Sequence, residues 1–192
     1  WIEVFNPGDL PADEEAASGL SGEIREAEAR YMPLQLRDTM EKTGYWGAVR
    51  VVPQGTEGGE VLVRGSILVS DGENLELDIT ALDAAGNEWF SSTYEAKVSV
   101  EAYRGAGQSG QEVFQALYNA IANDLTVHRA TLTAQDIATV RRVAALRFAE
   151  RRQPHLPGHP SRQLVRQSHA REAVLVELLD DVETTGHRLT LG

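Results

Sequence analysis

The alternation of apolar and polar positions divides the chain into a strand-rich middle and helical flanks. Residues 46–100 alternate β-branched or aromatic runs with compact turn sequences at hairpin spacing. We predict strands near 46–52, 60–70, 74–82 and 88–100. Because the connections are too short to return the chain to a parallel neighbour, the pattern predicts an antiparallel meander.

Before this meander, the segment from Ser21 to Gly44 is rich in helix formers, and Gly44 is a typical C-terminal cap. Pro33 lies inside it, so we expect a helix that is kinked or broken at that residue. Apolar residues at helical spacing predict the buried face: Ile24, Ala27, Tyr31, Leu34 and the Leu36/Met40 pair.

Two helices are predicted after the meander. In "EVFQALYNAIANDL", apolar residues at helical spacing predict a helix packed on the sheet. The second helix follows Thr133 as N-cap, with Asp136 completing a capping box. The predicted apolar stripe of this second helix is Ile137, Val140, Val143/Ala144, Leu146/Arg147 and Phe148.

Together these elements predict an α+β domain at 1–152. Its mostly antiparallel sheet of about five strands combines a short strand in "WIEVFNPG" with the meander at 46–100, and helices pack on one face. Loops are expected in "DLPADEEAASGLSG" and "AYRGAGQSGQ". Proline, histidine and arginine become frequent after Arg152, so 153–192 is predicted to be a loosely attached tail with one helix.

Charge narrows the classes of partner. Residues 1–125 carry 22 acidic and 8 basic side chains, whereas 126–192 carry 7 and 10. Such an acidic body repels phosphate backbones, so nucleic acid is not an expected partner.

No apolar run approaches the ~20 residues of a membrane-spanning helix. These 192 residues contain no cysteine, which excludes thiolate chemistry within them.

The stretch "SDGENLELDITALDAAGNEW" at 70–89 is the densest group of carboxylates, and we weighed a calcium site, a catalytic pair and a solvated sheet face. Strand alternation directs Glu76 and Asp78 away from the apolar face. Asp71 and Asp83 lie in turns at opposite ends of one strand, ~25 Å apart. The spacing does not match a calcium loop either, so a structural role is predicted.

No catalytic, metal-binding or cofactor-binding residue is assigned. The chain has no G-x-S-x-G, H-E-x-x-H or P-loop motif, and we expect a protein that is not an enzyme. His155, His159 and His169 could be considered zinc ligands. His155 and His159 lie in a Pro/Gly segment that cannot form a regular helix, and no carboxylate falls at a motif spacing, so no metal site is predicted.

Trp46 and Trp89 are the candidate ligand-binding residues. Both lie near predicted strand ends, where indole rings can stack on sugars. The alternative that both belong to the hydrophobic core is left open.

The order of the segments "WGAVRVVP", "VLVRGSILVSDGENLELDITALDAAGNEWF" and "YNAIANDL" after a helix resembles predicted proteobacterial envelope lipoproteins. More broadly, residues 1–150 are similar to the domain shared by the TolB amino terminus, the polysaccharide-export lipoprotein PelC, the penicillin-binding-protein activator LpoB and the curli pore protein CsgG. The lipobox cysteine is absent, and the tail departs from the family pattern.

The resemblance implies a non-enzymatic periplasmic protein, held at the outer membrane only through a lipid anchor upstream of Trp1. It would act as an accessory or scaffold protein through an envelope protein partner. The alternative is a periplasmic module that binds a glycan or small molecule. Pairing between copies, through an exposed strand edge at 1–5 or 88–100, stays open.

Overall fold

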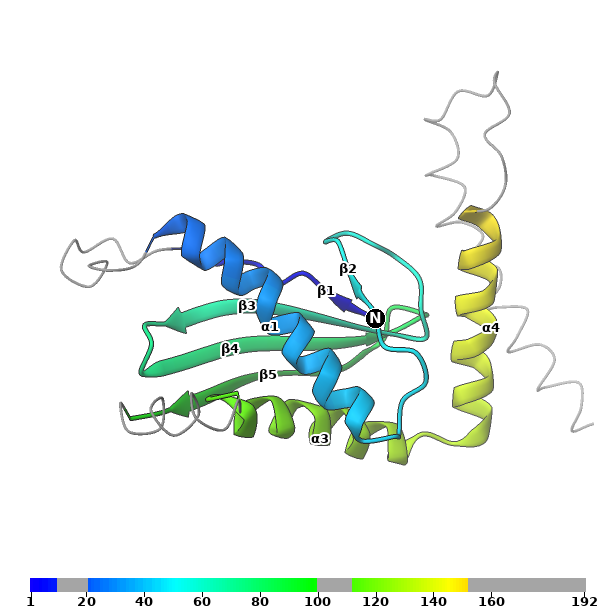
Figure 1. Cartoon of the computed structure of the whole chain (residues 1–192). Helices are drawn as coiled ribbons and strands as arrows, with labels where there is room; N and C mark the ends of the chain where they lie inside the picture. Colours follow the sequence, from blue (N-terminus) through cyan, green and yellow to red (C-terminus); the bar gives the residue numbers. More distant parts are fainter. Residues whose placement is uncertain (10–20, 100–111, 152–192) are drawn as a thin grey trace, which may run out of the picture. The chain divides into compact units, whose positions relative to one another are not determined.

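A computed structural model of the chain describes residues 1–9, 21–99 and 112–151 (Figure 1). The architecture is α+β, as predicted. The two predicted loops and the tail at 153–192 fall largely or wholly outside the described residues. The elements, in chain order, are β1 (Ile2–Glu3), α1 (Gly22–Lys42), β2 (Val51–Val52), β3 (Val61–Ser70), β4 (Asn74–Asp83), β5 (Glu88–Lys97), α3 (Gln115–Thr131) and α4 (Ala134–Arg151).

The five strands form a mixed sheet in the order β2-β1-β3-β4-β5. The antiparallel pairs β3–β4 and β4–β5 confirm the second half of the predicted meander. Its first half is wrong, because β2 pairs in parallel with β1 and β1 pairs in parallel with β3. The physical reason is that β1 lies between β2 and β3, so residues 53–60 connect two strands that are not neighbours and form no hairpin. The helix α1, between β1 and β2, is long enough to carry the chain back in the same direction. The predicted edge at 1–5 is also wrong, since β1 lies inside the sheet, whereas β5 is at an edge.

The helices α1 and α3 pack on one face of the sheet, as predicted. Leu75, Leu77, Ile79 and Ala81 of β4 are fully or almost fully buried and belong to a single core cluster with residues of both helices. The intervening residues of β4, which include Glu76 and Asp78, are half-buried on the opposite face. The alternation therefore disperses the carboxylates as expected.

The buried face of α1 was predicted only in part: the Leu36/Met40 pair is buried as predicted, whereas Ile24, Ala27, Tyr31 and Leu34 are exposed. Ile24 is 49% exposed and Tyr31 48% exposed, whereas Arg25 is only 3% exposed. Arg25 tolerates burial because its guanidinium donates to the Ser70 carbonyl at 3.4 Å and lies 3.6 Å from the Glu28 carboxylate. The buried residues of α1 are Arg25, Ala29, Met32, Pro33, Leu36, Thr39 and Met40.

Pro33 neither breaks α1 nor interrupts its assignment as one helix from Gly22 to Lys42. A proline at this position has no N–H to donate to the carbonyl of Ala29. The main-chain N–H of Phe5 donates to that carbonyl instead, at 3.0 Å. The freed acceptor thus attaches α1 to the chain just after β1.

The two later helices differ in how they pack. In α3, Leu117, Ile121 and Leu125 are buried, which confirms the predicted face. In α4, Val140 is buried, but Leu146 and Phe148 are half exposed, so the predicted stripe is not a core face. Short-range spacing cannot tell a helix that packs on a sheet from one that borders a cleft.

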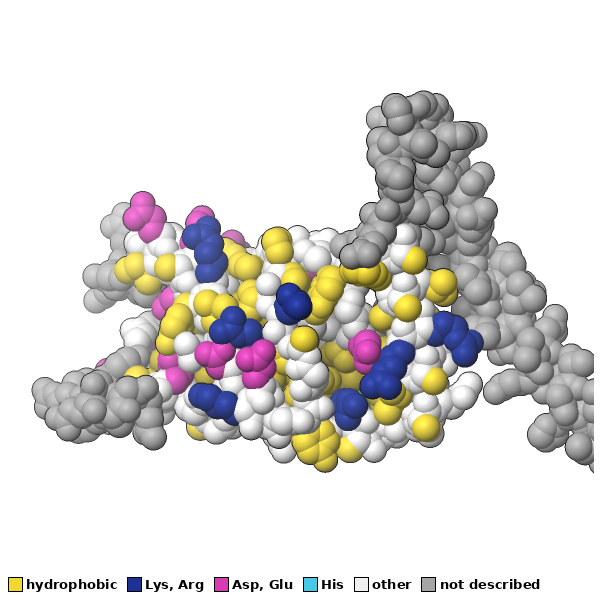
Figure 2. Space-filling view, turned by 45° about the vertical axis from the view of Figure 1, so that its right-hand side comes forward, with side chains coloured by type: hydrophobic (Ala, Val, Ile, Leu, Met, Phe, Trp, Pro, Cys, Tyr) yellow, Lys and Arg dark blue, Asp and Glu magenta, His cyan; other side chains and the backbone are white. Residues whose placement is uncertain are grey.

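The described surface carries charges of both signs. Figure 2 shows Lys and Arg side chains intermixed with Asp, Glu and hydrophobic ones on the face in view, without a continuous basic area there. No helix in the described ranges is long and apolar enough to cross a membrane.

Candidate functional site: a tryptophan cleft

Strand direction brings distant residues to one end of the sheet. β1, β2 and β3 run in parallel, and β5 runs in the direction of β3 because both are antiparallel to β4. The starts of these four strands therefore share one end. Trp1 precedes β1, Trp46 lies before β2, Glu60 precedes β3, and Trp89 is the second residue of β5.

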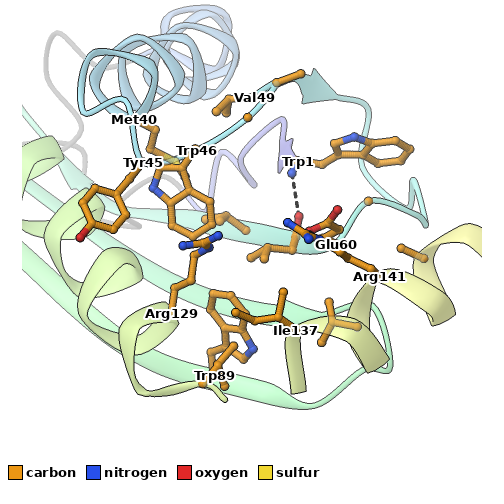
Figure 3. A pocket seen from close by; sticks show the side chains of 18 of the residues that line it. Trp1, Met40, Tyr45, Trp46, Val49, Glu60, Trp89, Arg129, Ile137 and Arg141 are labelled. Atoms are coloured by element: carbon orange, nitrogen blue, oxygen red, sulfur yellow. Dashed lines mark hydrogen bonds and ion pairs between the residues drawn. The ribbon is translucent and has the colours of Figure 1, made fainter. Parts of the chain in front are cut away.

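These residues line a cleft of about 560 Å³, named here the tryptophan cleft (Figure 3). All three tryptophans of the chain contribute to it. Its volume falls within the usual range for small-molecule pockets. The lining residues are Trp1, Met40, Tyr45, Trp46, Gly47, Ala48, Val49, Gly59, Glu60, Val61, Val63, Trp89, Arg129, Leu132, Ile137, Val140, Arg141, Ala144, Ala145 and Phe148.

On one side of the cleft, aromatic rings lie close to one another. The ring centroids of Trp46 and Trp89 are 6.5 Å apart, and the His128 ring stacks on Trp89 at 5.0 Å. The guanidinium carbon of Arg129 lies 5.7 Å from the Trp46 ring centroid, which is cation–π distance. Both indoles are half-buried and pack against the core cluster, so each side chain contacts the core and also lines the cleft.

Trp1 occupies the other side, next to Glu60 and Arg141 (Figure 3). Its indole lies on the backbone of Gly58 and Gly59, where a Cβ atom on Gly59 would come within 3.0 Å of the ring. Both glycines have positive φ, a conformation that other residues rarely adopt. The main-chain nitrogen of Trp1 donates to the Val61 carbonyl at 2.6 Å. Contacts with the backbone of residues 58–61 therefore position the third indole.

The helix α4 supplies the remaining wall. Thr133 and Asp136 form the predicted capping box: the Thr133 hydroxyl accepts from the Asp136 N–H at 3.2 Å, and the Asp136 carboxylate accepts from the Thr133 N–H at 2.8 Å. The hydrogen bond from the Thr133 hydroxyl lowers the pKa of Asp136. Arg141 of α4 pairs with Glu60 at 3.3 Å. Because this pair is exposed, it holds the wall only weakly.

Several of the ionisable side chains in the described part of the chain make structural contacts. Its one histidine, His128, is stacked on Trp89. No three metal-ligating side chains cluster among these residues. In the acidic stretch, Asp71 accepts three hydrogen bonds in its turn, and the side chain of Asn74 lowers its pKa. Asp83 accepts three in the other turn.

The structure thus brings the two candidate residues, Trp46 and Trp89, together. Sequence reasoning missed Trp1, His128 and Arg129. The available signal was that each tryptophan stands at or before the start of a strand, but using it required the strand directions. The histidines proposed and rejected as zinc ligands lie outside the described residues. No protein-family model matches the sequence, and no curated protein is significantly similar to it.

Proposed function

We propose that the chain is a non-enzymatic binding module whose tryptophan cleft holds a ligand that presents a ring. The observation that supports this is the convergence of all three tryptophans on one cleft of about 560 Å³. Indole faces favour flat rings and the C–H faces of sugars, because both are apolar and match the shape of the indole. The ligand class is therefore an aromatic compound or a pyranose.

One polar group in the cleft would orient such a ligand. The guanidinium of Arg129 lies over Trp46 and has no carboxylate at ion-pair distance within the described ranges. Its N–H donors can serve a hydroxyl or carbonyl oxygen of the ligand. A ring held by indoles and one oriented hydrogen bond is typical of a binding pocket.

Intrinsic fluorescence tests the proposal directly, since every tryptophan lies in the cleft. Indole-free aromatic fragments and methyl glycosides are titrated against the full chain while emission is followed. We expect at least one ring ligand to change emission, and Trp89→Leu to raise its Kd about tenfold, or ~1.4 kcal/mol. Tyr31→Leu, an aromatic replacement outside the cleft, is the matched control. The proposal fails if no ring compound changes emission, or if Trp89→Leu binds like the wild type.

A second candidate is the accessory or scaffold function in the periplasm at the outer membrane, which rests on the family resemblance. One observation favours it: Ile24, Ala27, Tyr31 and Leu34 form an exposed apolar stripe along α1. The test is photo-crosslinking from Leu34 of the full-length protein in its native envelope, with Glu41 as the control position. Recovery of the same proteins from both positions, or of none, would contradict a partner docked on α1.

A further inference from the structure

A second cleft, between α1 and α3, has a volume of about 810 Å³ and a different chemistry. Most of its lining side chains are uncharged hydrogen-bonding groups, and we name it the amide groove. Gln115, Asn119 and Asn123 line it from α3 at intervals of four residues, which places them on one helix face. Gln35 and Thr39 line it from α1.

Part of this polar lining is held in place by internal bonds. The Gln115 side-chain amide donates to the Thr39 hydroxyl at 2.9 Å and to the Asn119 side-chain oxygen at 3.0 Å. Asn119 and Asn123 are exposed. Within the described residues, the amide nitrogen of Asn119 and both polar atoms of Asn123 have no hydrogen-bond partner from the protein. The groove therefore presents both hydrogen-bond donors and acceptors, on side chains partly held in place by the hydrogen bonds of Gln115.

The two clefts share one wall. Tyr45, which is 57% exposed, lines both the tryptophan cleft and the amide groove. The charged residues of the groove are Lys42 and Glu112, which have opposite signs. A ligand that passes Tyr45 would meet stacking surfaces on one side and neutral hydrogen-bonding groups on the other.

We propose that the ligand is a neutral oligosaccharide that extends across Tyr45 into both clefts. One pyranose ring would stack in the tryptophan cleft, and the following residues would bond through their hydroxyls to Asn119 and Asn123. A saccharide fits because each residue has an apolar C–H face together with hydroxyls that both donate and accept. A peptide with large apolar side chains fits less well, since Tyr45 and Ala122 are the lining residues of the groove that are mainly apolar and the others have polar or charged side chains. This inference rests on the proposed function of the tryptophan cleft.

The test compares hexasaccharides with single rings. Cellohexaose, maltohexaose and chitohexaose, and the corresponding methyl glycosides, are titrated against the full chain by fluorescence and calorimetry. We expect at least one hexasaccharide to bind more tightly than its methyl glycoside. Asn119→Leu and Asn123→Leu should each raise the hexasaccharide Kd about fivefold, the effect of one lost hydrogen bond, and leave the methyl glycoside unchanged. Both sites are exposed on a helix, so folding should persist, and circular dichroism checks it.

Gln54→Leu is the matched control, because Gln54 is an exposed amide that lines neither cleft. Hexasaccharide binding that is unchanged in both asparagine variants would overturn the inference and leave the tryptophan cleft as a ring-binding site. The inference is also overturned if no hexasaccharide binds more tightly than its methyl glycoside. It is overturned as well if only a hexapeptide of alanine binds more weakly to Asn119→Leu and Asn123→Leu than to the wild type. Failure of every ring compound to change emission would overturn both proposals.

Discussion

Replacing Pro33 by Ala should leave the stability of the protein almost unchanged, although the same replacement in an ordinary exposed helix stabilises by ~3 kcal/mol. Here Pro33 is among the most completely buried side chains. The carbonyl that a helical N–H at 33 would use, that of Ala29, already accepts from Phe5 at 3.0 Å. The stability gained from the higher helix propensity of alanine is therefore offset by the loss of other interactions.

Two losses can be estimated. Removing two buried methylenes costs ~1.6 kcal/mol at ~0.8 each. Competition of the new N–H for the Ala29 carbonyl weakens the bond from Phe5, with ~1 kcal/mol at stake. These losses together offset the gain, so we expect a net change within ~1 kcal/mol of zero.

Denaturant unfolding of Pro33→Ala measures the net change, and amide hydrogen exchange locates its origin. The Phe5 amide should exchange about fivefold faster. The neighbouring Asn6 amide, which donates to Gly65 at 2.8 Å, is the internal control and should be unaffected. A stabilisation of ~3 kcal/mol with unchanged protection at Phe5 would refute the idea that this carbonyl attaches α1 to the chain after β1.

Three further predictions concern single sites. Gly65→Ala should destabilise by ~1–3 kcal/mol, because the added Cβ would lie 2.6 Å from the Phe5 ring; thermal unfolding measures this. The hydrogen bond to Glu112 raises the pKa of Tyr31 to about 12, so this contribution to stability is complete below pH 10.0 and is lost as the pH rises through about 12; Glu112→Gln should lower that pKa, as seen by NMR titration of the tyrosine ring. The pKa of Asp136 is lowered in the folded protein, so its capping contribution to stability is present above pH 3.8 and is lost as the pH falls through the folded pKa. Asp136→Asn should therefore speed amide exchange at the start of α4 at neutral pH.

Each prediction has its own control. Ser66→Ala, on the other face of β3, should change stability by less than ~0.5 kcal/mol, and an equal loss there would contradict the steric argument for Gly65. An unchanged Tyr31 pKa in Glu112→Gln would show that the carboxylate is not its main cause. For α4, wild type and Asp136→Asn should exchange alike once the pH is below the folded carboxyl pKa. A difference that persists there would contradict the capping role.

The candidate site was only partly readable from sequence. Trp46 and Trp89 could be selected because each lies near a strand end, where rings remain accessible. Trp1 could not be joined to them without the parallel pairing of β1 with β2 and β3. The amide groove was equally hidden, since the amides of α3 look like an ordinary solvated helix face until α1 lies beside them.

Features controlled by neighbouring residues could be predicted without the fold. The turns at Asp71 and Asp83, the alternating burial of β4, the buried face of α3 and the capping box at Thr133 all depend on hydrogen bonds or side-chain directions within a few residues.

The direction of β2, the face of α1 that is buried and the convergence of three tryptophans became known only from the three-dimensional fold. Those outcomes depend on contacts between residues far apart in the chain. On the face of α1 that packs against the core, Arg25 donates to the Ser70 carbonyl and Ala29 accepts from Phe5, beside the core residues Met32, Leu36 and Met40. Because such contacts leave no periodic signal, local pattern cannot reveal them.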